Sequence, residues 1–343
     1  MNANTGRQKL RAAIVGIGHQ ALEDHIPAIK NSDCAELVAI CDINKEIADD
    51  MGKKLNVKAY NDIDSLINSE KLDFIIITAP HCAHKEIIEK ASQKGIHILK
   101  EKPFTTSLAE AFYIKDLSER RNIKIMTTLQ RRFNPIYNSF FQLIEQIGTP
   151  FLIDIKYALY VPNPHEGWRG NKKEAGGGCI LDMGYHMIDL LIWYFGLPSE
   201  VHAEISCSAK PDYQYDAEDT ANIAFRYDNQ IHGTIRLSRF YAPKEEYFKV
   251  VGTKGVVEIQ RGKITRYDCE GKEIESLTRN NAWPSASSKQ IDYFCKVIRG
   301  QKPNMGDPNY HLKHMAFVEA CYLSAIERKY IKTKEVLGKW IKN

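Results

Sequence analysis

Short apolar runs alternate with amphipathic segments along the first 130 residues of the chain. The apolar runs are rich in isoleucine and valine and have the length of buried strands; they lie at 11–18, 35–42, 73–80, 96–103 and 123–130. The segments between them have helical spacing, most clearly at 44–56, 84–95 and 107–122. This alternation predicts a doubly wound parallel sheet.

The pattern changes after a helical segment at 134–148. Strand-like runs then follow one another with short turns between them, at 149–160, 200–209, 219–227, 230–240 and 246–260. Strands joined in this way pair antiparallel, so a largely antiparallel sheet is expected. One apolar helix at 176–196 interrupts the strands, and two helices near 285–300 and 309–329 close the chain.

The length and composition are typical of a globular protein with two domains. The chain has 343 residues, of which 43% are hydrophobic and 26% charged, so it can build two separate cores. We expect the first domain at 1–130 and the second at 131–343, with the last helices able to pack back on the first domain. The net charge is only +4 and the basic residues are scattered, so a nucleic-acid partner is not expected.

Several other classes of protein are disfavoured by the sequence. Apolar runs without charges are too short to cross a membrane, so no membrane partner is expected. The polar first residues lack the apolar core of a signal peptide, which predicts a cytoplasmic location. The eight cysteines form no C-x-x-C pair and are expected to be reduced thiols. The pairs His81/His84 and His311/His314 have loosely metal-like spacing, but without a cysteine or carboxylate cluster no metal is expected.

A glycine-rich turn follows the first predicted strand. Residues 16–21 read G-I-G-H-Q-A, the G-x-G-x-x-A form of the dinucleotide-binding turn. In such turns Gly16 would make the tight bend and Gly18 would let the backbone approach a pyrophosphate. Asp42 ends the next strand, where a carboxylate accepts hydrogen bonds from ribose hydroxyls and repels a 2′-phosphate. NAD is therefore expected rather than NADP, although the positive charge of Lys45, three residues later, would tolerate a phosphate.

Short segments that each contain polar residues stand at the ends of three later strands of the first half. These segments are Ala79-Pro80-His81, Lys100-Glu101-Lys102-Pro103 and Gln130-Arg131-Arg132. Because ligands of open parallel sheets bind beyond the carboxyl ends of the strands, we expect these segments to lie at the same edge as the glycine turn.

The apolar helix predicted at 176–196 carries three ionisable residues, Asp182, His186 and Asp189. Buried ionisable groups are costly unless they are paired or hydrogen-bonded. One interpretation is an internal Asp–His pair that only supports the fold. The other is a polar stripe facing a cleft, in which His186 moves a proton and Asp189 is structural.

These motifs together resemble the GFO/IDH/MocA (glucose–fructose oxidoreductase / inositol dehydrogenase) family over residues 9 to 330. The motifs that carry the resemblance are GIGHQA at 16–21, TAPHCAH at 78–84, EKP at 101–103, QRRFNP at 130–135 and GGGCILDMGYHMIDLLIWYFG at 176–196. The resemblance implies an α/β Rossmann domain and an α+β domain with an open, mostly antiparallel sheet that binds substrate and supports a homo-oligomer, dimer or tetramer.

The resemblance also implies roles for individual residues. Lys102 would contact nicotinamide and substrate, and the family's D-x-G-x-H signature falls on Asp182 and His186, which makes these three the expected catalytic residues. The expected cofactor-binding residues are Gly16, Ile17, Gly18, His19, Asp42, Ala79, His81, Glu101, Lys102, Gln130, Trp168 and Arg169. The expected substrate contacts are Lys102, Arg131, Tyr157, Asp182 and His186.

The expected function is an NAD-dependent dehydrogenase that oxidises a secondary hydroxyl of a sugar, sugar derivative or inositol to a ketone. His186 would take the hydroxyl proton, Asp182 would hold the hydroxyl, and Lys102 would stabilise the developing alkoxide. The same site run in reverse would be a keto-sugar reductase. Reduction of an imine or a conjugated double bond, or a nucleotide-binding sensor without catalysis, are the other interpretations.

Overall fold

The computed structural model describes residues 8–279 and 282–341, which divide into two compact units. The first unit contains the chain up to Phe104, then Tyr113–Phe133 and Trp283–Pro308. The second contains Thr105–Phe112, Asn134–Ala282 and the chain from Asn309 onward. Each unit is therefore assembled from segments that are far apart in the sequence.

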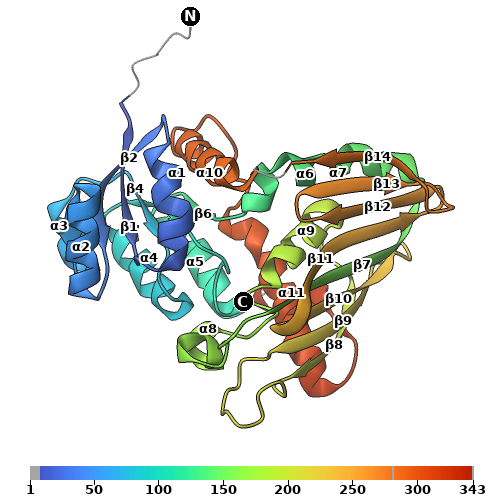
Figure 1. Cartoon of the computed structure of the whole chain (residues 1–343). Helices are drawn as coiled ribbons and strands as arrows, with labels where there is room; N and C mark the ends of the chain where they lie inside the picture. Colours follow the sequence, from blue (N-terminus) through green and yellow to red (C-terminus); the bar gives the residue numbers. More distant parts are fainter. Residues whose placement is uncertain (1–7, 280–281, 342–343) are drawn as a thin grey trace, which may run out of the picture. The chain divides into compact units, whose positions relative to one another are not determined.

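The first unit is built on a six-stranded sheet in the order β3-β2-β1-β4-β5-β6, and every neighbouring pair is parallel. The strands are β1 Leu10–Val15, β2 Ala35–Cys41, β3 Lys58–Tyr60, β4 Phe74–Ile77, β5 His97–Lys100 and β6 Ile125–Thr127. The α-helices are α1 Ile26–Lys30, α2 Lys45–Leu55, α3 Ile63–Ser69, α4 His84–Gln93, most of α5 Leu108–Arg120, and α10 Ala282–Ile298 (Figure 1). The strand order reverses between β1 and β4, which is where open parallel sheets bind their ligands.

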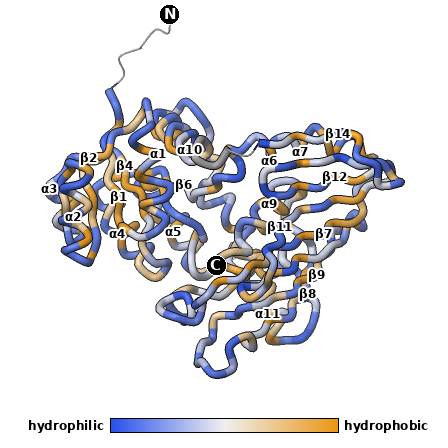
Figure 2. Tube along the Cα trace, in the orientation of Figure 1, coloured by the Kyte–Doolittle hydropathy of each residue, from blue (hydrophilic) through white to orange (hydrophobic). Residues whose placement is uncertain are grey.

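The core of the first unit combines its central strands with a helix from near the end of the chain. Hydrophobic residues are concentrated along β1 and β4 (Figure 2), and Ile14 and Ile76 are fully buried. Helix α10 adds Ile291 and Phe294 to the same cluster. The rings of Phe74 and Phe294 meet edge to face, with centroids 5.5 Å apart.

The second unit has a nine-stranded sheet in the order β14-β13-β12-β11-β7-β10-β9-β8-β15. Its strands are β7 Pro150–Tyr160, β8 Glu200–Ser206, β9 Thr220–Arg226, β10 His232–Ser238, β11 Phe240–Gly252, β12 Gly255–Gln260, β13 Lys263–Tyr267, β14 Glu273–Thr278 and β15 Ile331–Lys332. Only the β7–β10 pair is parallel among the described strands of this sheet. Its helices are α6 Pro135–Asn138, α7 Phe140–Ile144, α8 Lys172–Ala175, α9 Tyr185–Phe195, α11 Pro308–Glu327 and α12 Thr333–Ile341.

Alternating side chains of the central strands bury one face of this sheet. Ile153 and Ile155 on β7 pair across to Val250 and Phe248 on β11, and all four are buried. The ring of Tyr194 on α9 packs edge to face on Phe248, with centroids 5.4 Å apart. Helix α9 therefore lies against this buried face of the sheet, which explains why its sequence is apolar.

The predicted fold class is confirmed, but several local predictions were wrong. The helix predicted at 176–196 begins at Tyr185, and Gly176 to Gly184 form turns before it. The run 246–260 is a hairpin, because Gly252 and Gly255 pair across a turn that ends β11 and begins β12. The sequence prediction missed elements that are short or lie near sheet edges, where apolar alternation is weak: β3, α3, β13, β14, β15 and α12.

None of the helices within 8–279 and 282–341 has the length and apolarity needed to cross a membrane.

Candidate active site

The glycine turn in the first unit requires glycine for a steric reason at one position. Gly16 has φ +94°, and a Cβ there would lie 2.6 Å from the backbone nitrogen of Ala79. At Gly18 a Cβ would meet nothing within 4 Å. Gly18 and His19 are exposed, so the turn leaves its outer side open to a ligand approaching the start of the short helix Ala21–His25.

Asp42 is fixed beside this turn by hydrogen bonds to its carboxylate. The backbone N–H of Ile17 donates to Oδ2 at 2.7 Å, and that of Asn44 donates to Oδ1 at 2.9 Å. The carboxylate at the end of β2 is thereby tied to the turn after β1. The residues present fit a dinucleotide, because an open glycine turn and an oriented carboxylate lie together at the carboxyl edge of the sheet.

The segment after β4 closes the same edge. Thr78 donates its hydroxyl to the carbonyl of Val15 at 3.2 Å, and Nε2 of His84 lies 2.8 Å from the carbonyl oxygen of Ala79. Burial, with a smaller contribution from the positive charge of Lys100, holds the pKa of His84 well below its usual value. A neutral His84 that donates to Ala79 fixes this turn, in which His81 is also buried.

Glu101, expected among the cofactor-binding residues, has its carboxylate directed into the first unit. Its side chain is 10% exposed, and Oε1 lies 2.7 Å from Nε2 of the buried His25. The side-chain amide of Gln130 lies 3.4 Å from the same oxygen, and the backbone N–H of Lys102 donates to Oε2 at 3.2 Å. Burial has the largest single effect and would raise the pKa of Glu101, but the hydrogen bond and the charge of His25, together with the charge of Lys102, outweigh it, so the pKa is lowered. Glu101 therefore links the residues around it, while the side chain of Lys102 is partly exposed.

In the second unit a buried carboxylate that sequence reasoning missed holds the glycine segment before α9. Glu218 is 1% exposed, and its carboxylate accepts the N–H of Gly178 at 2.7 Å and of Ile180 at 2.9 Å. The Tyr322 hydroxyl donates to it at 3.0 Å. A Cβ on Gly178 would lie 2.0 Å from the Glu218 carbonyl oxygen, so the glycine allows the two backbones to meet. Burial raises the pKa of Glu218.

Asp182 is held by arginines that come from other segments. Nη2 of Arg239 lies 3.3 Å from Oδ2 of Asp182, and Nε of Arg169 lies 3.8 Å from the same oxygen. Arg239 also donates through Nη1 to the carbonyl of Arg169 at 3.3 Å, and its side chain is 3% exposed. The guanidinium of Arg169 lies 4.4 Å from the ring centroid of Trp168. Sequence reasoning missed Arg239, which follows β10 directly.

His186 and Asp182 stand out by their exposure. Between residues 177 and 192, all of which the structure describes, Asp182 and His186 are the positions that are not buried. His186 lies in the first turn of α9, and Asp182 precedes that helix. Two of the three residues of the predicted polar stripe are thus partly exposed, although Asp182 lies in a turn and only His186 lies on the helix.

The third ionisable residue of this segment, Asp189, is buried in a pair with α11. Its Oδ1 lies 2.9 Å from Nε2 of His314, with side chains 3% and 0% exposed. The hydroxyl of Tyr185 similarly lies 2.7 Å from Nδ1 of His311. His311 and His314, one of the two pairs with metal-like spacing, therefore form hydrogen bonds with side chains of α9. Among the described residues there is no group of three or more His, Cys, Asp or Glu side chains that could hold a metal ion.

Two expected substrate contacts are partly or fully buried. Arg131 is 6% exposed in the short helix Gln130–Phe133 of the first unit. Tyr157 is half-buried on β7 of the second unit, with the ammonium of Lys244 5.5 Å from its ring centroid. Lys102 belongs to the first unit and Asp182 and His186 to the second.

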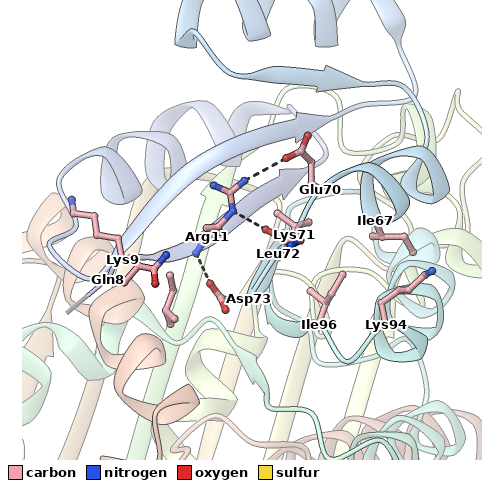
Figure 3. Close-up of a pocket in the computed structure, with 11 residues that line it drawn as sticks. Gln8, Lys9, Arg11, Ile67, Glu70, Lys71, Leu72, Asp73, Lys94 and Ile96 are labelled. Atoms are coloured by element: carbon pink, nitrogen blue, oxygen red, sulfur yellow. Dashed lines mark hydrogen bonds and ion pairs between the residues drawn. The ribbon is translucent and has the colours of Figure 1, made fainter.

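A hollow in the first unit lies at the opposite edge of the sheet, around the amino end of β1 (Figure 3). Arg11 dominates it, because its backbone N–H donates to Asp73 at 2.7 Å and its Nε to the carbonyl of Lys71 at 2.9 Å. Its guanidinium also pairs with Glu70 at 3.5 Å (Figure 3). These bonds join strand ends and involve none of the expected site residues.

Both halves of the chain match models of one protein family. Residues 10–129 match the model described as "Oxidoreductase family, NAD-binding Rossmann fold", and residues 142–258 match the GFO/IDH/MocA C-terminal domain. Glucose-6-phosphate 3-dehydrogenase of Bacillus subtilis is 29% identical over 71% of this chain and 72% of its own length. Myo-inositol 2-dehydrogenase of Thermotoga maritima is 26% identical over 96% of this chain and 100% of its own. The crystal structure of an oxidoreductase from Thermotoga maritima superposes with a TM-score of 0.85 at 27% identity, covering 96% of this chain and 100% of that one.

Proposed function

The chain belongs to the GFO/IDH/MocA family of oxidoreductases, and on that premise we propose that it oxidises a secondary hydroxyl of a sugar, sugar derivative or inositol to a ketone. The first unit, whose turn and carboxylate suit a dinucleotide, would bind NAD, and the second would bind the substrate. The observation that carries the proposal is the exposure of Asp182 and His186 within an otherwise buried stretch. Two partly exposed ionisable side chains in an otherwise buried apolar segment are candidates for proton chemistry.

NAD, when bound, supplies the acceptor for the hydride. The chain's own residues would handle the proton and the charge. His186 would accept the proton of the substrate hydroxyl, and the partly exposed ammonium of Lys102 would stabilise the oxygen as negative charge develops on it. Asp182, fixed by Arg239, would hold the substrate hydroxyl toward the imidazole.

Asp42 supports NAD as the cofactor in preference to NADP. Both of its carboxylate oxygens accept backbone N–H groups, so the negative charge is held at the end of β2. A 2′-phosphate placed there would be repelled, whereas two ribose hydroxyls would donate to the remaining lone pairs.

The proposal is tested by following NADH absorbance with a panel of aldoses, sugar phosphates, nucleotide sugars and inositols. At least one cyclic polyol should give turnover that depends on NAD and is lost in His186→Asn. A matched series with NADH and the corresponding keto compounds measures the reverse direction, a keto-sugar reductase. Imines and conjugated alkenes are assayed with NADH in the same way, and turnover confined to them would replace the proposal with an ene or imine reductase. NAD binding without turnover of any of these compounds would favour a sensor.

The proposal extends to the protein's surroundings in two respects. A homo-oligomer, dimer or tetramer, agrees with the half-buried and exposed aromatic side chains of the second unit's sheet, among them Phe151 and Tyr160 at 43% and 55% exposure. Light scattering at several concentrations tests this. A cytoplasmic location agrees with cysteines that form no disulfide among the described residues.

A further inference from the structure

Lys100 is a lysine with no exposed surface, at the last position of β5. Its ammonium donates to three carbonyl oxygens, those of Glu101 at 2.8 Å, Pro103 at 2.5 Å and Phe104 at 2.8 Å. An ammonium has three N–H donors, and here each has an acceptor. A buried charge is costly unless it is satisfied in this way, so the turn and the lysine stabilise one another.

The three carbonyls belong to the segment that carries Lys102. Glu101 and Pro103 are its immediate neighbours, so the backbone on both sides of Lys102 is bonded to the Lys100 ammonium. The N–H of Lys102 itself donates to the Glu101 carboxylate, which is in turn held by His25. The backbone around Lys102 is thus held by the Lys100 ammonium at the end of β5 and by the Glu101 carboxylate, while the side chain of Lys102 stays partly exposed.

We propose that Lys100 is a positioning residue, whose buried ammonium fixes the turn 101–104 so that Lys102 is presented to the substrate. The proposal rests on the proposed function, in which Lys102 stabilises the developing charge. Catalytic groups lose much of their effect when they are displaced by about 1 Å. Lys100 would therefore act on turnover through Lys102, without contacting the substrate or the cofactor.

A double-mutant cycle separates this role from a general contribution to folding. The variants are Lys100→Met, Lys102→Ala and the double variant, with the exposed Lys94→Met as the matched control. We expect Lys100→Met to lower kcat by about tenfold or more, with NAD affinity and substrate KM changed far less. In the Lys102→Ala background the same substitution should change kcat by less than about twofold, because the group it positions is gone.

Hydrogen exchange supplies a readout that does not depend on activity. Amides of 101–108 should exchange faster in Lys100→Met than in the wild type, and those of α2 should be unchanged. Lys100→Gln, which keeps two N–H donors, should fall between the wild type and Lys100→Met in both kcat and exchange, and it serves if the methionine variant does not fold.

The outcomes distinguish the two proposals. If Lys102→Ala keeps near-normal turnover, the role proposed for Lys102 fails, and the positioning role fails with it. If Lys102→Ala is impaired but Lys100→Met is not, only the positioning role is overturned. An equal loss of kcat from Lys100→Met in both backgrounds, or failure of both Lys100 variants to fold, also overturns it in favour of a structural role.

Discussion

The guanidinium of Arg239 reaches Asp182, with Nη2 and Oδ2 3.3 Å apart, from a position 57 residues later in the chain. The side chain of Arg239 is buried and that of Asp182 is partly exposed, so a fixed guanidinium holds the Asp182 carboxylate in one orientation. An oriented carboxylate can hold a hydroxyl in one direction, whereas a solvated one cannot. Arg239 therefore belongs with the residues that shape the proposed site.

Arg239→Gln should lower both stability and turnover. Removing the guanidinium breaks its hydrogen bonds to the Asp182 carboxylate and to the Arg169 carbonyl. Hydrogen bonds to charged groups contribute about 1.5–3 kcal/mol each to stability. Thermal unfolding and steady-state kinetics measure the two effects. The control is Arg226→Gln, which breaks the more exposed pair with Glu200 and should cost less than about 1 kcal/mol. Equal behaviour of the two variants would contradict a special role for Arg239.

Asp42→Ala should weaken NAD binding and narrow the preference over NADP. Loss of one charge-assisted hydrogen bond of about 1.5–3 kcal/mol corresponds to a tenfold or greater loss of affinity. Titration with both nucleotides, followed by fluorescence, measures the preference. Asp49→Ala on the exposed side of α2 is the matched control and should bind both nucleotides like the wild type. Wild-type protein that binds NADP more tightly than NAD would refute the role given to Asp42.

His186→Asn should lower kcat by about a hundred- to ten-thousandfold, the range for general acid–base catalysis. A protonated imidazole cannot accept the hydroxyl proton, so wild-type turnover should fall as the pH is lowered, and the variant's residual activity should lose this limb. NAD affinity should hardly change, because the glycine turn and Asp42 lie in the other unit. A pH–rate profile, an NAD titration and a melting curve of the same variant make the test. A lower melting temperature with an unaltered pH profile would instead make His186 a residue of the core.

Glu101 predicts how stability depends on pH. Its pKa in the folded protein is lowered from 4.5, so the folded state favours the carboxylate. Its contribution is fully present above pH 4.5, the unfolded value, and is lost as the pH falls through the lower folded value. The Tm of Glu101→Gln should therefore lie below that of the wild type at neutral pH and approach it in acid. Glu46 is exposed, so the Tm of Glu46→Gln should follow that of the wild type at every pH. A Glu101→Gln variant whose Tm equals that of the wild type at neutral pH would contradict a stabilising His25–Glu101 pair.

Local pattern was sufficient to predict five of the six strands of the first unit, because strands such as β1, β4 and β5 are buried apolar runs that need no partner to be recognised, whereas the three-residue β3 was missed. Helical spacing predicted one polar stripe of Asp182, His186 and Asp189. Asp182 and His186 are partly exposed, but Asp189 is buried and the helix predicted at Asp182 was wrong. Glu218 and Arg239 could not be predicted, since each meets its partners only after the chain has returned from 38 or more residues away. A single carboxylate or guanidinium among many carries no signal until the fold brings it to a buried backbone N–H or charge.

The long sequence distance between α10 and the strands that it covers governs the order in which the protein can fold during synthesis. Phe74 and Ile14 leave the ribosome early, but Phe294 and Ile291, which share their cluster, are made only after strands β7 to β14 of the large sheet. The nucleotide-binding unit must wait with an uncovered apolar face while the second unit is translated. Apolar surface exposed in this way favours aggregation, and a fragment ending at Phe133 would lack the helix that covers it. We therefore expect the first unit to fold on its own only when α10 is joined back to it.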